Sequence, residues 1–291
     1  MNPVGVCTWI WVSPFTDDDA GLVGHAKELG ADVLELCIED TSRVTAEAIL
    51  AAAGASDMRF SLCGAFGPER DVSHEEPKIR RLGLDYIEFL VDLAAGIGAP
   101  TVVGPMYSAV GKARMLGAEE REQQRRWAVE SLKHAADYAA KKGVRLAVEP
   151  LNRFETDLVN TAEQALELCD RVGYENVGLL LDTFHMNIEE KSIPDAIRLA
   201  GDRLFHVHSC ENDRGTPGTG HVPWPEVFRA LHDIDYKGFL VTESFTPAVQ
   251  EIAKAVSMWR SLDASGDAMA TQALDFVRAG LHAAAPEPAI S

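Results

Sequence analysis

The feature that most constrains this chain is a repeated alternation of short apolar, β-branched runs with longer runs of helical periodicity. The short runs predict strands at residues 4–10, 33–38, 59–63, 101–103, 144–148, 177–181, 204–207 and 239–242. The longer runs predict helices at residues 17–29, 45–53, 75–97, 118–142, 162–171, 193–199, 225–234, 249–262 and 269–279. Strands that alternate with helices are typical of a parallel sheet. Eight such units within 291 residues predict an α/β fold of the (β/α)8 TIM-barrel type.

An open, doubly wound sheet is the alternative arrangement of the same units. It would need a glycine-rich turn after the first strand, and the segment CTWIWVSPF at residues 7–15 is not one. No stretch rich in proline, glycine or serine divides the chain. We therefore expect one barrel domain over residues 1–282 and a frayed tail over residues 283–291.

Charge and cysteine usage narrow the functional class. Lysine and arginine number 27 against 45 acidic residues, so the formal net charge is −18. Such a charge repels nucleic-acid phosphates and anionic lipid, so we expect neither as a partner.

The five cysteines include no C-x-x-C pair, which argues against a disulfide framework or a zinc ribbon and favours a reducing compartment. Because the N-terminus lacks a signal-peptide pattern and no apolar run could span a bilayer, we expect a cytoplasmic protein.

Four consecutive predicted strands end at residues that can bind a metal ion, and in a (β/α)8 barrel these ends form the active site. The four residues are Glu149, Asp182, His208 and Glu243. One carboxylate at such a junction is commonly a helix N-cap, but four in series are harder to explain in that way. Three converging carboxylates repel one another unless a cation lies between them. Three oxygen ligands and one imidazole suit Mn²⁺, Mg²⁺ or Co²⁺ better than a thiolate-type zinc site.

Three further polar residues follow these strands in segments predicted to be loops at the rim of the pocket. Glu155, His185 and Arg214 could there bind the hydroxyl and carbonyl groups of a polar substrate. His206 points the same way as His208 but one layer deeper, so we expect a hydrogen-bonded core histidine.

Other residues near the predicted site are more ambiguous. Trp9 and Trp11 would share one face of the first strand, where one of them could wall the pocket or both could fill the core. Cys210 is expected to be a small residue in a packed turn, with a catalytic thiol as the alternative. The segment GTPGTG at residues 215–220 does not match a phosphate-binding loop.

Several segments closely resemble the ketose 3-epimerases, a group of xylose-isomerase-like barrels that includes D-tagatose, D-allulose (D-psicose) and L-ribulose 3-epimerases. The segments are AVEPLNRFETDLVNT, GLLLDTFHMNIEE, HVHSCENDRGTPGTGHVPW, VTESF and MWRSL, within residues 144–262. The resemblance implies a TIM barrel with one divalent metal, with Mn²⁺ expected and Co²⁺ or Mg²⁺ as alternatives. It places the metal ligands on the four residues named above and the substrate contacts on Glu155, His185 and Arg214. It also implies a homodimer or homotetramer.

The activity implied by this resemblance is C3 epimerisation of a free ketose through a cis-enediolate, with Glu149 and Glu243 as the acid/base pair. Substrate pairs of the D-fructose/D-allulose, D-tagatose/D-sorbose and L-ribulose/L-xylulose types are all compatible with it. The alternatives on the same metal site are a related sugar isomerase, a hydroxypyruvate isomerase or an inosose dehydratase. More remote are an abasic-site endonuclease, which needs a basic groove, and a carbohydrate-binding protein without activity.

Overall fold

Eight parallel strands close into a barrel in their sequence order in this computed structural model, which describes residues 2–285. The strands are β1 (Val4–Cys7), β2 (Val33–Ile38), β3 (Arg59–Gly64), β4 (Thr101–Gly104), β5 (Arg145–Val148), β6 (Val177–Asp182), β7 (Leu204–His208) and β8 (Phe239–Thr242). The barrel closes between β1 and β8, where Val4 lies opposite Leu240. This closure confirms the predicted (β/α)8 fold and excludes the open sheet.

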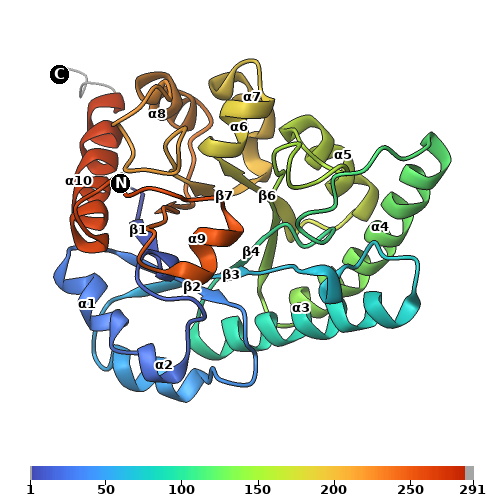
Figure 1. Ribbon diagram of the computed structural model, residues 1–291, viewed down its shortest axis with the longest axis horizontal. Helices are drawn as coiled ribbons and strands as arrows, with labels where there is room; N and C mark the ends of the chain where they lie inside the picture. Colours follow the sequence, from blue (N-terminus) through green and yellow to red (C-terminus); the bar gives the residue numbers. More distant parts are fainter. Residues whose placement is uncertain (1, 286–291) are drawn as a thin grey trace, which may run out of the picture.

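Helices follow the strands and form a ring around the barrel (Figure 1). They are α1 (Leu22–Glu28), α2 (Ala46–Ala53), α3 (Pro77–Ile97), α4 (Ala118–Lys141), α5 (Ala162–Val172), α6 (Thr183–Glu189), α7 (Ile193–Ala200), α8 (Trp224–Asp233), α9 (Gln250–Ala255) and α10 (Gly266–Ala284). Local sequence explains their ends. In α5, for example, the Thr161 hydroxyl accepts the backbone N–H of Gln164, and Gly173 ends the helix at a φ of 74° that favours glycine.

The first predicted strand is wrong at its C-terminal end. β1 stops at Cys7, and Thr8–Ile10 form a short 3₁₀ turn, η1, in which the Thr8 hydroxyl accepts the backbone N–H of Cys37. As a result the two tryptophans do not share a strand face. Trp9 donates its indole N–H to Glu39, whereas Trp11 donates to Asp267 next to the start of α10.

Three predicted helical or loop segments also need correction. The helix expected over residues 17–29 divides into a 3₁₀ turn, η2 (Asp17–Asp19), and α1. The helix expected over residues 249–262 is only the six-residue α9. Residues 183–189, expected to be a loop, form α6, because the Asp182 carboxylate caps the helix by accepting the backbone N–H of Phe184 at 2.7 Å.

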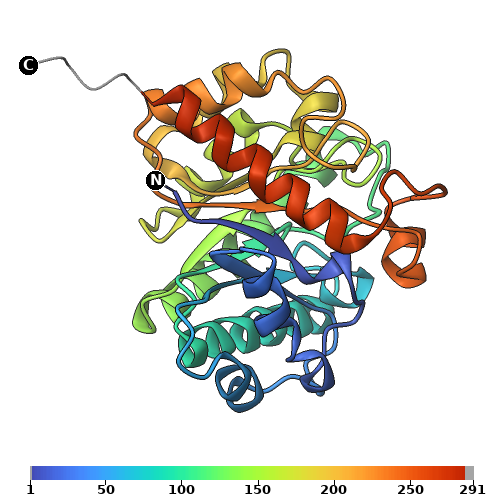
Figure 2. The same cartoon turned by 90° about the vertical axis from the view of Figure 1, so that its left-hand side faces the viewer.

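The last described helix, α10, lies along β1 and α8 (Figure 2). It continues to Ala284, so the first two residues of the expected tail are helical, and residues 286–291 of that tail lie outside the described residues. Among residues 2–285, no helix has both the length and the apolar character needed to cross a membrane.

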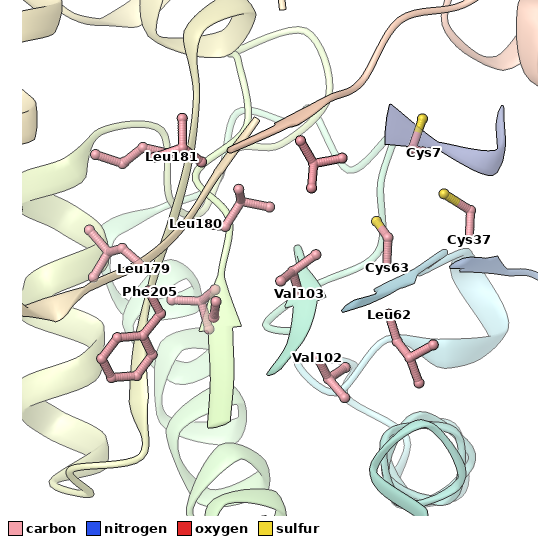
Figure 3. Close-up of a cluster of buried hydrophobic side chains, with 14 of the residues drawn as sticks. Cys7, Cys37, Leu62, Cys63, Val102, Val103, Leu179, Leu180, Leu181 and Phe205 are labelled. Carbon is pink, nitrogen blue, oxygen red and sulfur yellow. The ribbon is translucent and has the colours of Figure 1, made fainter. Parts of the chain in front are cut away.

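The buried side chains of the barrel and of the layer between strands and helices are mostly apolar. Cys7, Cys37 and Cys63 lie near one another on the neighbouring strands β1, β2 and β3 (Figure 3). All five cysteines of the chain are buried and free. The first three strands therefore carry thiols towards their C-terminal ends, where the later strands carry the predicted metal ligands.

Candidate active site

The structure brings the four predicted metal ligands together at one end of the barrel. Asp182 and His208 are the last residues of β6 and β7, whereas Glu149 and Glu243 each follow the last residue of β5 and β8. All four side chains are buried, and each offers one ligand atom within 4.8 Å of the others. Four donors from four neighbouring strands at this spacing could hold one metal ion.

The electrostatics of this cluster favour a cation. Burial raises the pKa of Glu149 well above its usual range, and the nearby charge of Glu243 raises it further. Burial likewise raises the pKa of Asp182 to about 7, although Arg214 opposes this effect. Because like charges in a buried site are costly, a divalent ion would stabilise the ionised form of these carboxylates.

His208 supplies a separate test of whether a metal ion fits. Its Nδ1 atom is buried, has no hydrogen-bond partner among the described residues, and lies 3.4 Å from Glu243 Oε1 and 3.9 Å from Glu149 Oε1. A buried polar atom without a partner normally costs free energy. An imidazole nitrogen aimed at three carboxylates is well placed to bind a metal ion, so the residues fit the expected group.

Arg214 occupies the same site from the loop after β7. Its Nη1 atom donates to Asp182 Oδ2 at 3.0 Å and to Glu243 Oε2 at 2.8 Å. The guanidinium also stacks on the ring of Phe184 at 3.9 Å. Its φ of 68° is uncommon for a residue other than glycine, and the backbone N–H of Arg214 is held by the Glu211 carbonyl at 3.0 Å. This backbone conformation places the guanidinium group against Asp182 and Glu243, two of the predicted metal ligands.

His185 and Glu155 lie at the rim of the cluster and share a partner, Asn152. The backbone N–H of Asn152 donates to His185 Nδ1 at 3.1 Å, and its side-chain amide donates to Glu155 Oε1 at 2.8 Å. Burial lowers the pKa of His185, and the charge of Arg214 lowers it further. A neutral ring that accepts at Nδ1 carries its proton on Nε2, which lies 3.6 Å from Glu149 Oε1. The same Nε2 atom lies 3.3 Å from Nη2 of Arg214, which can only donate, so an acceptor oxygen placed between the two groups would satisfy both.

A cavity of about 220 Å³ opens above the cluster. Glu149, Glu155, His185, Arg214 and Glu243 form its polar side. Its apolar side consists of Trp9, Cys63, Phe66, Pro105, Val110, Phe245 and three residues of α9 or its end, namely Ile252, Ala255 and Val256. Figure 1 shows α9 across the centre of the ring of helices. A larger hollow of about 540 Å³ lies beside α4 and shares no residue with this cavity.

Trp9 and Cys210, which the sequence left ambiguous, differ in their access to the cavity. Trp9 is the tryptophan that walls the cavity, with its ring centroid 6.0 Å from that of Phe245. Cys210 is fully buried, and burial raises the pKa of its thiol well above the usual range. Its Sγ atom lies 2.7 Å from the backbone oxygen of Glu243. A thiol held in this protonated state is a packing group, as the first interpretation had it, and a poor nucleophile.

Sequence reasoning missed three residues that support the site. Asn152 donates hydrogen bonds to both His185 and Glu155. Glu211 is fully buried and accepts from the backbone N–H groups of Gly218 and Val222 and from the indole of Trp224, which shapes the loop that carries Arg214. Glu35 on β2 contacts His208 from inside the barrel. The sequence offered a signal for two of them, because Asn152 lies in the segment AVEPLNRFETDLVNT and Glu211 in the segment HVHSCENDRGTPGTGHVPW.

His206 is a buried core histidine, as expected, but neither of its ring nitrogens makes the expected hydrogen bond to a described residue. It is buried one layer below His208, and its Nε2 atom lies 2.9 Å from Glu35 Oε2 without the alignment of a hydrogen bond. Burial alone would raise the pKa of Glu35, but the two histidines outweigh this effect and hold it well below its usual range. The contacts with these two histidines favour the ionised form of Glu35, which lies beneath the metal-ligand cluster.

Comparison with known proteins places this geometry in a family. Residues 23–262 match the model of the xylose isomerase-like TIM barrel family. The chain is 34% identical to a D-psicose 3-epimerase of Agrobacterium fabrum over 266 residues, which cover 90% of this chain and 92% of that protein. It is 32% identical to a probable ketose 3-epimerase of Synechocystis sp. over 274 residues, or 94% and 95% of the two chains.

Solved structures give the same result. A crystal structure of D-allulose 3-epimerase from Methylomonas sp. in complex with D-allulose superposes with a TM-score of 0.90 at 30% identity, covering 96% of both chains. These relatives are named as ketose 3-epimerases, which are enzymes of the isomerase class. The chain therefore belongs to the xylose isomerase-like TIM barrel family and, within it, to the group of ketose 3-epimerases.

Proposed function

We propose that this protein catalyses the metal-dependent epimerisation of a free ketose at C3. The observation that carries the proposal is the pair of glutamates, Glu149 after β5 and Glu243 after β8, which line one cavity from strands three steps apart around the barrel. Relatives named D-psicose and L-ribulose 3-epimerases align with about nine-tenths of the chain and support the same reaction.

The proposed reaction needs two groups that exchange protons with C3 from opposite faces of the sugar. A single base would return the proton to the face from which it came. Strands five and eight are separated by roughly 135° around an eight-stranded barrel, which allows two carboxylates to flank a flat cis-enediolate. One glutamate would take the C3 proton, and the other would deliver a proton to the opposite face.

We propose Mn²⁺ as the resident ion, with Co²⁺ or Mg²⁺ as alternatives, held by Glu149, Asp182, His208 and Glu243. A bound divalent ion supplies Lewis-acid stabilisation of negative charge on the substrate oxygens. The mixed oxygen and nitrogen donor set and the unpartnered Nδ1 atom of His208 support this choice.

The remaining polar residues would bind and orient the ketose. Arg214 and the Nε2–H group of His185 would donate to its oxygens, and Glu155, held by Asn152, would accept from a hydroxyl. Arg214 is the only lysine or arginine that lines the cavity within residues 2–285, and two carboxylates already engage it. This charge balance favours a free sugar over a sugar phosphate.

The sugar pair, the assembly and the location belong to the same proposal. Substrate pairs of the D-fructose/D-allulose, D-tagatose/D-sorbose or L-ribulose/L-xylulose types fit a small cavity with one polar and one apolar side. We propose a homodimer or homotetramer in the cytoplasm, and the five free thiols support a reducing compartment.

The test is incubation of metal-reconstituted enzyme with a panel of ketoses in D₂O, followed by NMR, with a chelator-treated control. We expect metal-dependent deuterium at C3 and the appearance of the C3 epimer. Label at C1 with an aldose product would instead indicate an aldose–ketose isomerase on the same site. Loss of water from the substrate would indicate a dehydratase.

A further inference from the structure

A buried glutamate on the opposite side of the barrel contacts the proposed histidine ligand. Glu35 lies in the middle of β2, and its side chain crosses the barrel interior to β7, past β1 and β8. Its Oε1 atom is 2.7 Å from Nε2 of His208, at a position 173 residues away in the sequence. Both side chains are fully buried. Neither residue lines the substrate cavity.

We propose that Glu35 is a positioning residue, which holds the His208 ring so that Nδ1 faces the three carboxylates and serves as the metal ligand. This inference rests on the proposed metal-dependent function and deepens it, because it assigns a role to a residue that does not itself touch metal or substrate.

The two nitrogens of the His208 imidazole have different roles. A neutral ring carries one proton, and whichever nitrogen holds it cannot bind a metal ion. A carboxylate can only accept, so Nε2 of His208 donates to Glu35, and in the neutral form of the ring, which is the form that binds metal, the lone pair is on Nδ1. The same Nδ1 atom is buried, unpartnered among the described residues, and 3.4 Å from Glu243 Oε1. One hydrogen bond therefore selects both the orientation of the ring and its tautomer.

Glu35 is itself held on both oxygens, so it can act as a fixed support. The Ser61 hydroxyl on β3 donates to Oε2 at 2.8 Å, and His206 Nε2 lies 2.9 Å from the same oxygen. The rings of His206 and His208 meet edge to face, with centroids 5.3 Å apart. Residues of two other strands, β3 and β7, thus hold this carboxylate of β2, and rotation of the His208 ring would break its hydrogen bond and leave a buried charge unpaired.

A second metal site at Glu35, His206 and His208 is the alternative interpretation of this cluster. The distances argue against it. Two ligand atoms that share a tetrahedral ion, each at about 2.1 Å from it, lie about 3.4 Å apart. Glu35 and His208 approach to 2.7 Å, which is a hydrogen-bond distance. The carboxylate therefore supports the ligand and does not bind metal itself, as is common around metal-bound histidines.

The experiment compares two substitutions of Glu35 with a matched control. Glu35→Leu removes the acceptor, whereas Glu35→Gln keeps one acceptor oxygen and removes the charge. The control is Asp71→Asn, which changes another buried acidic residue, paired with Lys112 outside the cavity. Purified, metal-free proteins are titrated with Mn²⁺ by calorimetry, and the visible absorption of the Co²⁺ form is recorded at saturation. Thermal unfolding without metal reports whether each variant is folded.

We expect the Mn²⁺ dissociation constant to rise about 100-fold in Glu35→Leu and about tenfold in Glu35→Gln, with no change in Asp71→Asn. The Co²⁺ absorption band of Glu35→Leu should shift or weaken, because its nitrogen ligand is misplaced. A merely structural role would lower the unfolding temperature and leave the spectrum as in the wild type. A tighter Mn²⁺ dissociation constant in Glu35→Gln than in Glu35→Leu would show that the acceptor oxygen matters and not only the volume of the side chain.

Two results would overturn the inference in different ways. If a folded Glu35→Leu protein binds Mn²⁺ with wild-type affinity and has a wild-type Co²⁺ spectrum, Glu35 does not position the ligand, and the proposed function is unaffected. If the wild-type protein binds no divalent ion, the metal-dependent function fails together with the inference. Should the leucine variant not fold, unchanged affinity and spectrum in the glutamine variant are sufficient to reject the role.

Discussion

The two halves of the barrel carry different side chains at the C-terminal ends of their strands. Strands β5–β8 present three carboxylates and an imidazole, whereas β1–β3 carry Cys7, Cys37 and Cys63 near their ends. The second half could hold a cation and exchange protons, and the first half gives a pocket wall of low polarity. A small polar substrate placed between them would bind with its reacting end on β5–β8. The proposed acid/base groups and polar substrate contacts thus all come from β5–β8 and the segments that follow these strands, whereas β1–β4 and their loops supply only apolar or small residues to the cavity wall.

Glu35 is the exception that joins the two halves. It comes from β2 in the apolar half, yet its carboxylate contacts two histidines of β7. A charge buried in that half would be costly without these partners. In its proposed role, this residue of β2 would support the metal ligand that β7 supplies.

Removal of the metal should have the largest effect, and it acts on the β5–β8 half alone. Chelation followed by dialysis is expected to reduce epimerisation to background, and Mn²⁺ should restore it. An ion bound only by the folded state stabilises it by about 2.7 kcal/mol at a concentration 100-fold above its dissociation constant. Thermal unfolding with and without Mn²⁺ measures this gain. Full activity in protein shown to be metal-free by elemental analysis would contradict the proposed division of roles.

The next largest effect should come from the acid/base pair. Glu149→Gln and Glu243→Gln are each expected to lower kcat by about a thousandfold, because the amide cannot transfer a proton. Each should also weaken metal binding. Rates measured at saturating Mn²⁺ separate the two effects. The control is Glu190→Gln, which changes a half-buried residue that caps the N-terminus of α5. Near-normal turnover in either active-site variant would reject the two-base mechanism.

Substitution of Arg214 tests how the loop after β7 contributes to the site formed by β5–β8. Arg214→Lys keeps the charge but loses the planar fork that reaches Asp182 and Glu243 and stacks on Phe184. We expect kcat/KM to fall by about 10- to 100-fold in steady-state assays. The matched control, Arg153→Lys, changes an exposed arginine paired with Glu189 and should alter kcat/KM less than about twofold. Equal effects of the two substitutions would argue against a substrate contact at Arg214.

The smallest effect should come from the apolar half. Cys63→Ala trims a cavity-lining side chain and is expected to change KM by less than about fivefold, with kcat maintained. Cys169→Ala removes another buried thiol, one that does not line the cavity, and should leave both constants unchanged. A large loss of kcat in Cys63→Ala would show that the division between the two halves is too simple.

The sequence predicted some parts of the site better than others, for local reasons. Strands two and eight have the predicted bounds, because each is a short, largely apolar run between turn residues. Helix α6 was missed because its seven residues are too short to show a periodic pattern. Glu35 was missed because a single acid within the run VLELCI gives no sign of partners more than 170 residues away.

The sequence by itself determined the number and order of the strand–helix units and the residues at the ends of the later strands. Periodicity and strand length are local properties, so the chain expresses them without reference to distant segments. Only the tertiary structure decided which atoms meet: Glu35 with His208, Asn152 with His185, and Arg214 with two carboxylates. These contacts depend on closure of the barrel, on side-chain orientation inside it and on the path of each loop, and no local pattern encodes them.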